Sequence, residues 1–137
     1  MHCKHIQAKK INDMFFKKHE KTEPQQLPWK SLEAMDSLDS LTMASEEKPQ
    51  LIFKHSTRCI ISKMALRSFE NEWEEYGGID ADIHFLDLIA FRDVSNEIAS
   101  RFSVVHESPQ VILLSGGKAI YDDSHQSISL GEVRKRI

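Results

Sequence analysis

The feature that most constrains the fold is an alternation of strand-like and helix-like apolar patterns along the chain. Short apolar runs typical of strands recur at 51–55, 82–90 and 108–123. Between these runs lie segments whose apolar residues repeat every three to four positions, as they do on the buried face of a helix. Strands that alternate with helices favour a sheet with a parallel core covered by helices. We therefore predict an α/β fold.

The strongest helical pattern begins at Cys59 and stops at the pair Gly77 and Gly78, whose freedom to adopt positive φ suits a helix C-terminal cap. A further amphipathic pattern covers residues 91–103, with weaker ones at 37–47 and 129–137. In the strongest pattern, the predicted buried stripe is Ile61, Ala65, Phe69, Trp73 and Tyr76, with Lys63, Arg67, Glu70 and Glu74 at other positions.

Two glycines divide the last apolar run into the strands of a hairpin. Ser115, Gly116 and Gly117 provide the turn, and this hairpin adds an antiparallel edge to the sheet. With a short first strand within 29–35, the predicted element order is β-α-β-α-β-α-β-β-α.

Length and composition set the class of protein. The chain has 137 residues, enough for one ordinary domain, and 40% of them are hydrophobic. No apolar run approaches the roughly 20 residues of a spanning helix, so we expect no membrane insertion. Two cysteines do not form a disulfide framework, which favours a reducing, cytoplasmic location.

Charge is distributed unevenly along the chain. Residues 1–22 carry six lysines and two acidic residues, whereas the remainder has 12 basic and 19 acidic residues. The acidic body argues against nucleic-acid binding, which needs a basic face. We interpret residues 1–26 as a disordered basic leader and 27–137 as the folded domain. A cluster of His2, Cys3 and His5 lies in the leader, and we expect no metal site there because zinc sites draw ligands from a folded frame.

Cys59 lies at the predicted junction between a strand and a helix. At a helix N-terminus, unpaired N–H groups and the helix dipole favour an anion, and either Ser56 or Thr57 is a candidate cap. Arg58 adds a fixed positive charge beside the sulfur, and Lys54 and His55 are candidates for more. These features favour the thiolate, which is the form that attacks disulfides. The alternative, an inert buried cysteine, stays open at this point.

The sequence around Cys59 has no CxxC pair, because the third residue after it is Ser62. A site with one cysteine can accept a thiol group from another protein. It then needs a second thiol, from solution or from a partner, to release that group.

A second informative segment is HESPQVIL, residues 106–113. A polar residue followed by proline directly before a buried strand is a candidate cis-proline, Pro109. In a thiol-handling fold the backbone of Ser108 would pair with an extended substrate. The alternative is that Pro109 merely starts a strand.

The two segments, IFKHSTRCIIS and HESPQVILLSGGKAIYDDSH, together resemble the monothiol bacilliredoxins of the YtxJ type, and the resemblance covers about residues 29–137. It implies a thioredoxin-like, three-layer α/β/α fold with a mixed central sheet. It also implies that Cys59 is the redox cysteine, that Thr57 and Arg58 stabilise its thiolate, and that Ser108 and Pro109 bind substrate. The family usually has proline directly after the cysteine, where this chain has Ile60.

From the resemblance we expect a thiol–disulfide oxidoreductase with a single catalytic cysteine. It would remove a low-molecular-weight thiol, bacillithiol in this family, from the cysteines of S-thiolated client proteins, with bacillithiol as cosubstrate and no bound cofactor. The alternative is a thioredoxin-fold binding module or redox sensor whose cysteine is modified without turnover. Ile60 keeps this alternative open.

Overall fold

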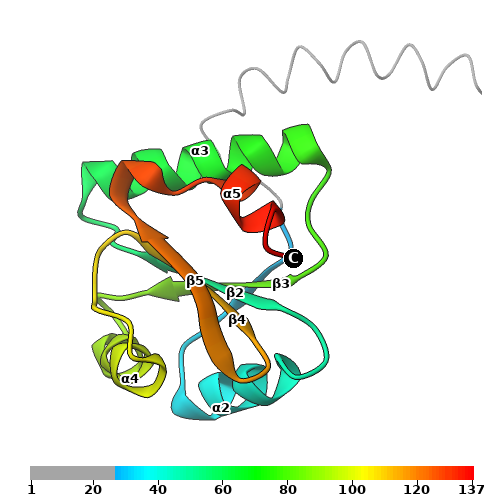
Figure 1. Cartoon of the computed structure of the whole chain (residues 1–137). Coiled ribbons are helices and arrows are strands. Elements are labelled where there is room, and N and C mark those ends of the chain that lie inside the picture. The colour runs from blue at the N-terminus through cyan, green and yellow to red at the C-terminus, as the bar shows by residue number, and fades with distance from the viewer. Residues whose placement is uncertain (1–26) are drawn as a thin grey trace, which may run out of the picture.

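The computed structural model of the chain describes residues 27–137 (Figure 1). The predictions for residues 1–26, including the basic leader and the His2, Cys3 and His5 cluster, lie outside the described residues. In chain order the elements are β1 (Trp29–Ser31), α2 (Met35–Ala44), β2 (Gln50–His55), α3 (Ile60–Tyr76), β3 (Asp82–Asp87), α4 (Arg92–Phe102), β4 (Gln110–Ser115), β5 (Lys118–Ser124), the short 3₁₀ helix η2 (His125–Ser127) and α5 (Leu130–Arg134).

The strands form one mixed sheet in the order β1-β3-β2-β4-β5. Strands β1 and β2 both run parallel to β3, with Leu51 opposite Ile83. Strand β4 runs antiparallel to β2, and β5 antiparallel to β4. The predicted element order is confirmed, but the antiparallel part is wider than the hairpin alone. The segment between α4 and β4 returns the chain so that β4 enters the sheet in the opposite direction to β2.

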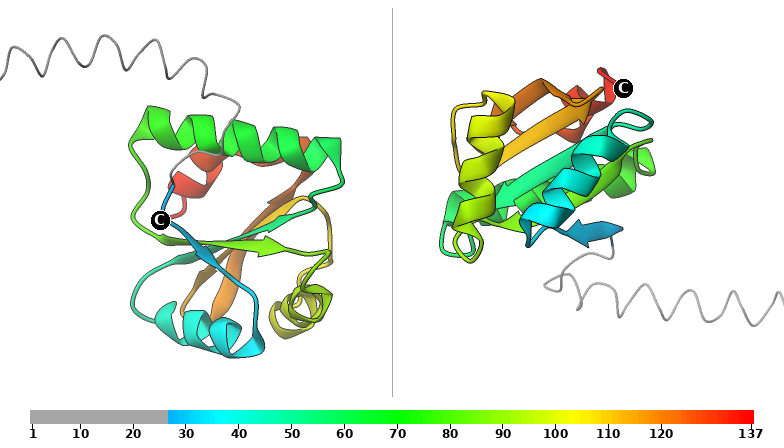
Figure 2. Two further views of the ribbon diagram at one scale, coloured as in Figure 1. Left: turned by 180° about the vertical axis from the view of Figure 1, so that it is seen from behind. Right: turned by 90° about the horizontal axis from the view of Figure 1, so that it is seen from below.

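Helices cover both faces of the sheet, α3 and α5 on one and α2 and α4 on the other (Figures 1 and 2). Side chains alternate along β2, so Leu51 and Phe53 pack toward α3 and α5 while Ile52 packs toward α2 and α4. Each face therefore has its own hydrophobic core, and the three-layer α/β/α architecture is confirmed.

The buried face of α3 differs from the predicted stripe at both ends, since Ile61 is only half-buried and Ser62 is the buried residue of the first turn. Ala65 and Phe69 are buried and Trp73 packs against the same core, as predicted. Tyr76 is exposed, because the last turn extends beyond the core, and its ring lies 4.3 Å from the Arg134 guanidinium carbon. Glu70, assigned to the polar positions, is buried, and burial raises the pKa of its carboxyl group.

Strand β3 ends earlier than its apolar pattern indicated, at Asp87 rather than at residue 90. The Asp87 side chain explains the difference. Its Oδ1 accepts hydrogen bonds from the backbone N–H groups of Ile89 at 3.1 Å and Ala90 at 3.2 Å. Such a side-chain-to-backbone turn competes with the strand ladder, so the chain leaves the sheet and turns toward α4.

Positive φ angles confirm the predicted helix cap at Gly77 and the predicted hairpin turn at Gly116 and Gly117. Gly77 caps α3 at φ 77°, with its N–H donating to the Trp73 carbonyl at 2.9 Å. Gly116 and Gly117, at φ 63° and 77°, form the two-residue turn between β4 and β5. Positive φ at both central residues is typical of hairpin turns that match the strand twist.

Candidate functional site

Cys59 lies at the junction that the sequence predicted, after the end of β2 and at the start of α3. It is the N-cap residue of α3, with extended backbone (φ −109°, ψ 124°), and its side chain is half-buried. Its N–H donates to the Ser56 carbonyl at 3.3 Å, which closes the turn between strand and helix. Cys59 therefore lies in the turn between a central strand and α3, and the residue is partly exposed.

The start of α3 leaves backbone donors beside the cysteine. The first helical hydrogen bond runs from the Lys63 N–H to the Cys59 carbonyl at 3.1 Å. The N–H groups of residues 60, 61 and 62 consequently have no partner within the helix. A helix N-terminus with free donors favours a negative charge, here on the sulfur.

The predicted cap of α3 by Ser56 or Thr57 is wrong, because no side chain of the described residues caps this helix. Ser56 is buried in the turn, where its Oγ accepts the Arg58 N–H at 3.4 Å. Thr57 and Arg58 are exposed, and the thiolate-stabilising role predicted for them stays a prediction. The turn places Cys59 itself at the cap position, three residues after Ser56 and two after Thr57.

A buried polar network missed by the sequence analysis holds this turn in place. Ser62 Oγ accepts the Ser56 N–H at 3.0 Å and lies 2.7 Å from His55 Nδ1. Because the hydroxyl already accepts from Ser56, its proton is available to His55. Burial is the main cause that lowers the pKa of His55, with Asp87 opposing it and Lys63 adding to it. His55 is thus neutral at pH 7 and adds no positive charge to the site.

The sequence made Lys54 a candidate for a further positive charge beside the sulfur. In the structure its side chain lies on the face of the sheet opposite to α3. Successive residues of a strand point to opposite faces, so Lys54 lies on the α4 face and His55 on the α3 face. Lys54 Nζ donates to the Ser95 carbonyl of α4 at 3.1 Å and lies 3.2 Å from His106 Nδ1. A signal for this burial was present in the sequence, since Lys54 interrupts an otherwise apolar run.

The second predicted segment enters the sheet at the same end. The Ser108–Pro109 peptide bond is cis, as the sequence analysis predicted. Gln110 pairs with Lys54, so the start of β4 lies beside the end of β2. Pro109 is buried, and its carbonyl accepts the His125 N–H at 3.0 Å. The structure therefore places the Cys59 turn and the Ser108–Pro109 segment at one end of the sheet, while their roles in binding stay a prediction.

Two further histidines of the described residues lie in or beside the sheet. His84 is buried in β3, and its Nε2 lies 2.7 Å from Gln50 Oε1. Burial lowers the pKa of His84 to about 4. His125 is the first residue of η2, and its Nε2 lies 3.4 Å from Glu107 Oε1.

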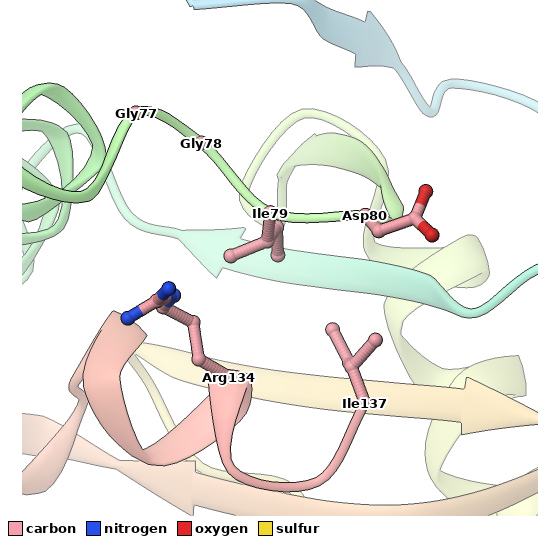
Figure 3. Close-up of a pocket in the computed structure, with 6 residues that line it drawn as sticks. All are labelled: Gly77, Gly78, Ile79, Asp80, Arg134 and Ile137. Atoms are coloured by element: carbon pink, nitrogen blue, oxygen red, sulfur yellow. The ribbon is translucent and has the colours of Figure 1, made fainter.

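A surface pocket of the described residues lies elsewhere (Figure 3). It has a volume of about 520 Å³, and in Figure 3 Arg134 and Ile137 face the segment 77–80 across it. It adjoins the C-terminal end of α3, roughly 25 Å along the helix from Cys59. It is therefore separate from the thiol. Within residues 27–137, no group of three or more candidate ligands forms a metal site, and no helix is long and apolar enough to cross a membrane.

Comparison with solved structures identifies the fold. The chain is similar to a protein described as an oxidoreductase with a thioredoxin fold, at 27% identity and a TM-score of 0.67, covering 79% of this chain and 92% of the other. It is also similar to mitochondrial thioredoxin 3 of Saccharomyces cerevisiae, at 17% identity and TM-score 0.63, covering 80% and 95%. A thioredoxin from Nicotiana alata has 20% identity and TM-score 0.60, covering 83% and 95%. The last two establish the fold alone, and the predicted thioredoxin-like fold is confirmed.

The family follows from the sequence match. Residues 30–133 match the family described as monothiol bacilliredoxin BrxC, which covers most of the chain and both segments of the candidate site. The chain therefore belongs to the monothiol bacilliredoxin family, whose members are thiol oxidoreductases with a thioredoxin fold.

Proposed function

We propose that this protein is a thiol–disulfide oxidoreductase that uses Cys59 alone to remove a low-molecular-weight thiol, of the bacillithiol type, from cysteines of client proteins. The observation that carries the proposal is the position of Cys59 in a bacilliredoxin chain. It is the N-cap residue of α3, half-buried, with free backbone donors beside it and no second cysteine in the described residues.

The proposed reaction has two exchange steps. The Cys59 thiolate attacks the sulfur of the small thiol in the mixed disulfide on the client. The disulfide breaks, the client cysteine leaves as a thiolate that takes a proton from solvent, and the small thiol stays on Cys59. A second thiol, as thiolate, then attacks the small-thiol sulfur and forms a disulfide with it, and Cys59 leaves as a thiolate. Overall the mixed disulfide on the client is reduced and the second thiol is oxidised to the new disulfide.

The described residues support specific parts of these steps. The N–H groups at residues 60–62 and the charge of Arg58 stabilise the attacking thiolate. Ser108, half-buried beside Pro109, offers its backbone to an extended segment of the client, in the manner of an added strand. The clients and the small thiol are partners of the reaction, and the cytoplasm, where thiols are kept reduced, is the compartment that suits it.

A second candidate function is a redox sensor or binding module whose cysteine is modified without turnover. Ile60 favours it, because the family usually has proline there. The Ile60 side chain is 68% exposed beside the cysteine. An exposed branched side chain at this position obstructs approach to the sulfur more than a compact proline ring does.

One experiment separates the two functions. The reduced protein is mixed with a client blocked by labelled bacillithiol, in excess free thiol, and release of the label is followed. We expect many equivalents to be released per protein by the wild type, none by Cys59→Ser, and a wild-type rate for Cys3→Ser. Release that stops after one equivalent would favour the sensor.

A further inference from the structure

Lys54 is a buried cation with no counter-ion among residues 27–137. Its side chain is 0% exposed, and it forms no ion pair with a carboxylate of residues 27–137. Its polar contacts are the Ser95 carbonyl at 3.1 Å and His106 Nδ1 at 3.2 Å. Because burying an unpaired charge is costly, the position of this lysine calls for an explanation beyond packing.

His106 belongs to the segment that connects α4 to Pro109. The buried side chain of Gln110, the first residue of β4, anchors this segment to the sheet. Its Nε2 donates to the Val105 carbonyl at 2.9 Å, and its Oε1 accepts the Glu107 N–H at 3.4 Å. Lys54, opposite Gln110 in the β2–β4 register, adds a third anchor through the His106 ring.

The contact with Lys54 decides which nitrogen of His106 carries the proton. An ammonium group has no lone pair, so Nδ1 must accept its hydrogen bond and Nε2 must carry the N–H. Burial lowers the pKa of His106, with Lys54 and Arg92 adding to it and Glu107 opposing it, so the ring is neutral at pH 7. His106 is exposed, so with Nδ1 bound to Lys54 the Nε2–H is the ring donor left for a ligand.

The charges that face His106 favour an anion at this edge. Lys54 of β2 and Arg92 of α4 both act on the ring as cations, and Glu107 of the same segment is the opposing carboxylate. Glu107 has a partner of its own, since its Oε1 lies 3.4 Å from His125 Nε2. A neutral N–H donor in a positive field is suited to a carboxylate, with which it forms a charge-assisted hydrogen bond.

We propose that Lys54 is a positioning residue that holds His106 with Nε2–H outward, and that His106 thereby binds the carboxylate of an acidic small thiol during exchange at Cys59. The inference rests on the proposed function and adds the residues that would recognise a carboxylate on the small thiol. His106 lies two residues before Ser108, in the segment that enters the sheet beside the Cys59 turn, so the small thiol would occupy this end of the sheet.

The test uses two small disulfides that differ in charge. 2-Thiopyridine is joined to 3-mercaptopropionate, which carries a carboxylate, or to 2-mercaptoethanol, which is neutral. The Cys59 thiolate attacks the small-thiol sulfur, the disulfide breaks, and the pyridinethiolate leaves, takes a proton and is measured by absorbance. The full chain with Cys3→Ser is used, so that only Cys59 reacts. The measured quantity is the ratio of the two rate constants, acidic over neutral.

We expect Lys54→Met and His106→Asn to lower this ratio by about fivefold, the scale of one exposed charge-assisted contact, with the neutral disulfide unaffected. His106→Gln, which keeps an outward amide donor, should retain most of the ratio. Lys118→Met is the matched control, since it removes one exposed charge at the other end of the sheet, and it should leave the ratio unchanged. An equal fall in Lys118→Met would overturn the inference.

The pH dependence of the same ratio gives an independent readout. Both disulfides react with the same thiolate, so the titration of Cys59 cancels from the ratio. Burial lowers the pKa of Lys54 to about 8, so we expect the ratio to decrease as the pH rises through this value and Lys54 loses its charge. In Lys54→Met this decrease should disappear, and its persistence there would contradict the role of Lys54.

The state of the His106 ring can be observed directly by nitrogen NMR of the imidazole. The wild type should show protonated Nε2 and unprotonated Nδ1 at pH 7, and Lys54→Met should show exchange between tautomers. A wild-type ring protonated at Nδ1 would overturn the inference. If neither disulfide releases pyridinethione from the wild type, the proposed function fails instead. If pyridinethione is released but Lys54→Met and His106→Asn keep the wild-type ratio, the proposed function stands and only this inference fails.

Discussion

At the scale of single residues, Lys54 combines a cost in stability with a position near the candidate site. Its fully buried ammonium contacts two neutral acceptors, the Ser95 carbonyl and His106 Nδ1. Burial lowers the pKa of Lys54 from its ordinary value of 10.5 to about 8. Lys54 decreases stability and at the same time orients an exposed side chain. Such a residue is expected at positions where binding, and not stability, favours that amino acid.

Lys54→Met is expected to stabilise the protein at pH 7 by about 1 to 3 kcal/mol, because the shift from 10.5 to about 8 corresponds to roughly 3 kcal/mol of unfavourable charge burial. Between pH 8 and 10.5 the unfolded wild type binds the proton that the folded wild type has lost. Wild-type stability therefore rises through this window, and the advantage of the variant should shrink. Urea denaturation at several pH values measures it, and a difference independent of pH would contradict the cause.

At the scale of elements, the start of α3 accommodates the proline that the family usually has. Cys59 has ψ 124°, which is the conformation that a following proline requires. Ile60 is the first helical residue, where the N–H has no partner within the helix and proline is well tolerated. The structure of the element therefore does not explain the isoleucine.

Ile60→Pro should consequently fold and increase the free energy of unfolding by about 0.4 to 1 kcal/mol, because proline restricts the unfolded chain without removing a helical hydrogen bond. Denaturant titration measures the change. Ile60→Ala is the control, because it removes the exposed side chain without restricting the backbone, and it should lie within about 0.5 kcal/mol of the wild type. A destabilised Ile60→Pro would contradict the backbone geometry described at Cys59.

At the scale of the whole molecule, the two cores contribute differently to the site. The core between the sheet and α3 is aromatic, with the Phe69 ring 5.6 Å from Trp29 and 5.5 Å from Phe53. It fixes α3, and with it the position of Cys59, against the sheet. The opposite core, formed with α2 and α4, is mainly aliphatic, and α4 supplies the Ser95 carbonyl that Lys54 contacts.

Phe69→Ala is expected to destabilise the protein by about 3 to 5 kcal/mol, since it opens a cavity in a fully buried aromatic cluster. Urea denaturation followed by tryptophan fluorescence measures the loss, and Trp29 reports directly on the cavity. Met64→Ala, on the same helix and 63% exposed, is the matched control and should change stability by less than about 0.5 kcal/mol. Similar effects of the two substitutions would contradict the assignment of the buried face.

Much of the architecture was accessible from sequence because local patterns determine it. The apolar alternation, the stripe at Ala65 and Phe69 and the two glycine turns each predicted an element that the structure contains. Cys59 and Pro109 were identified because a cysteine at a helix start and a proline before a buried strand are local signals. The prediction that failed at the site, a cap of α3 by Ser56 or Thr57, depends on the local geometry of the turn before Cys59.

The sequence by itself determined the order of elements, the single cysteine at a helix start and the family. Only the tertiary structure decided that β4 lies antiparallel to β2, so that residues 50 positions apart, Cys59 and Pro109, reach one end of the sheet. It also decided that Lys54 is buried against Ser95 and His106. The physical reason is that pairing direction and burial arise from contacts between distant segments, which no local pattern records.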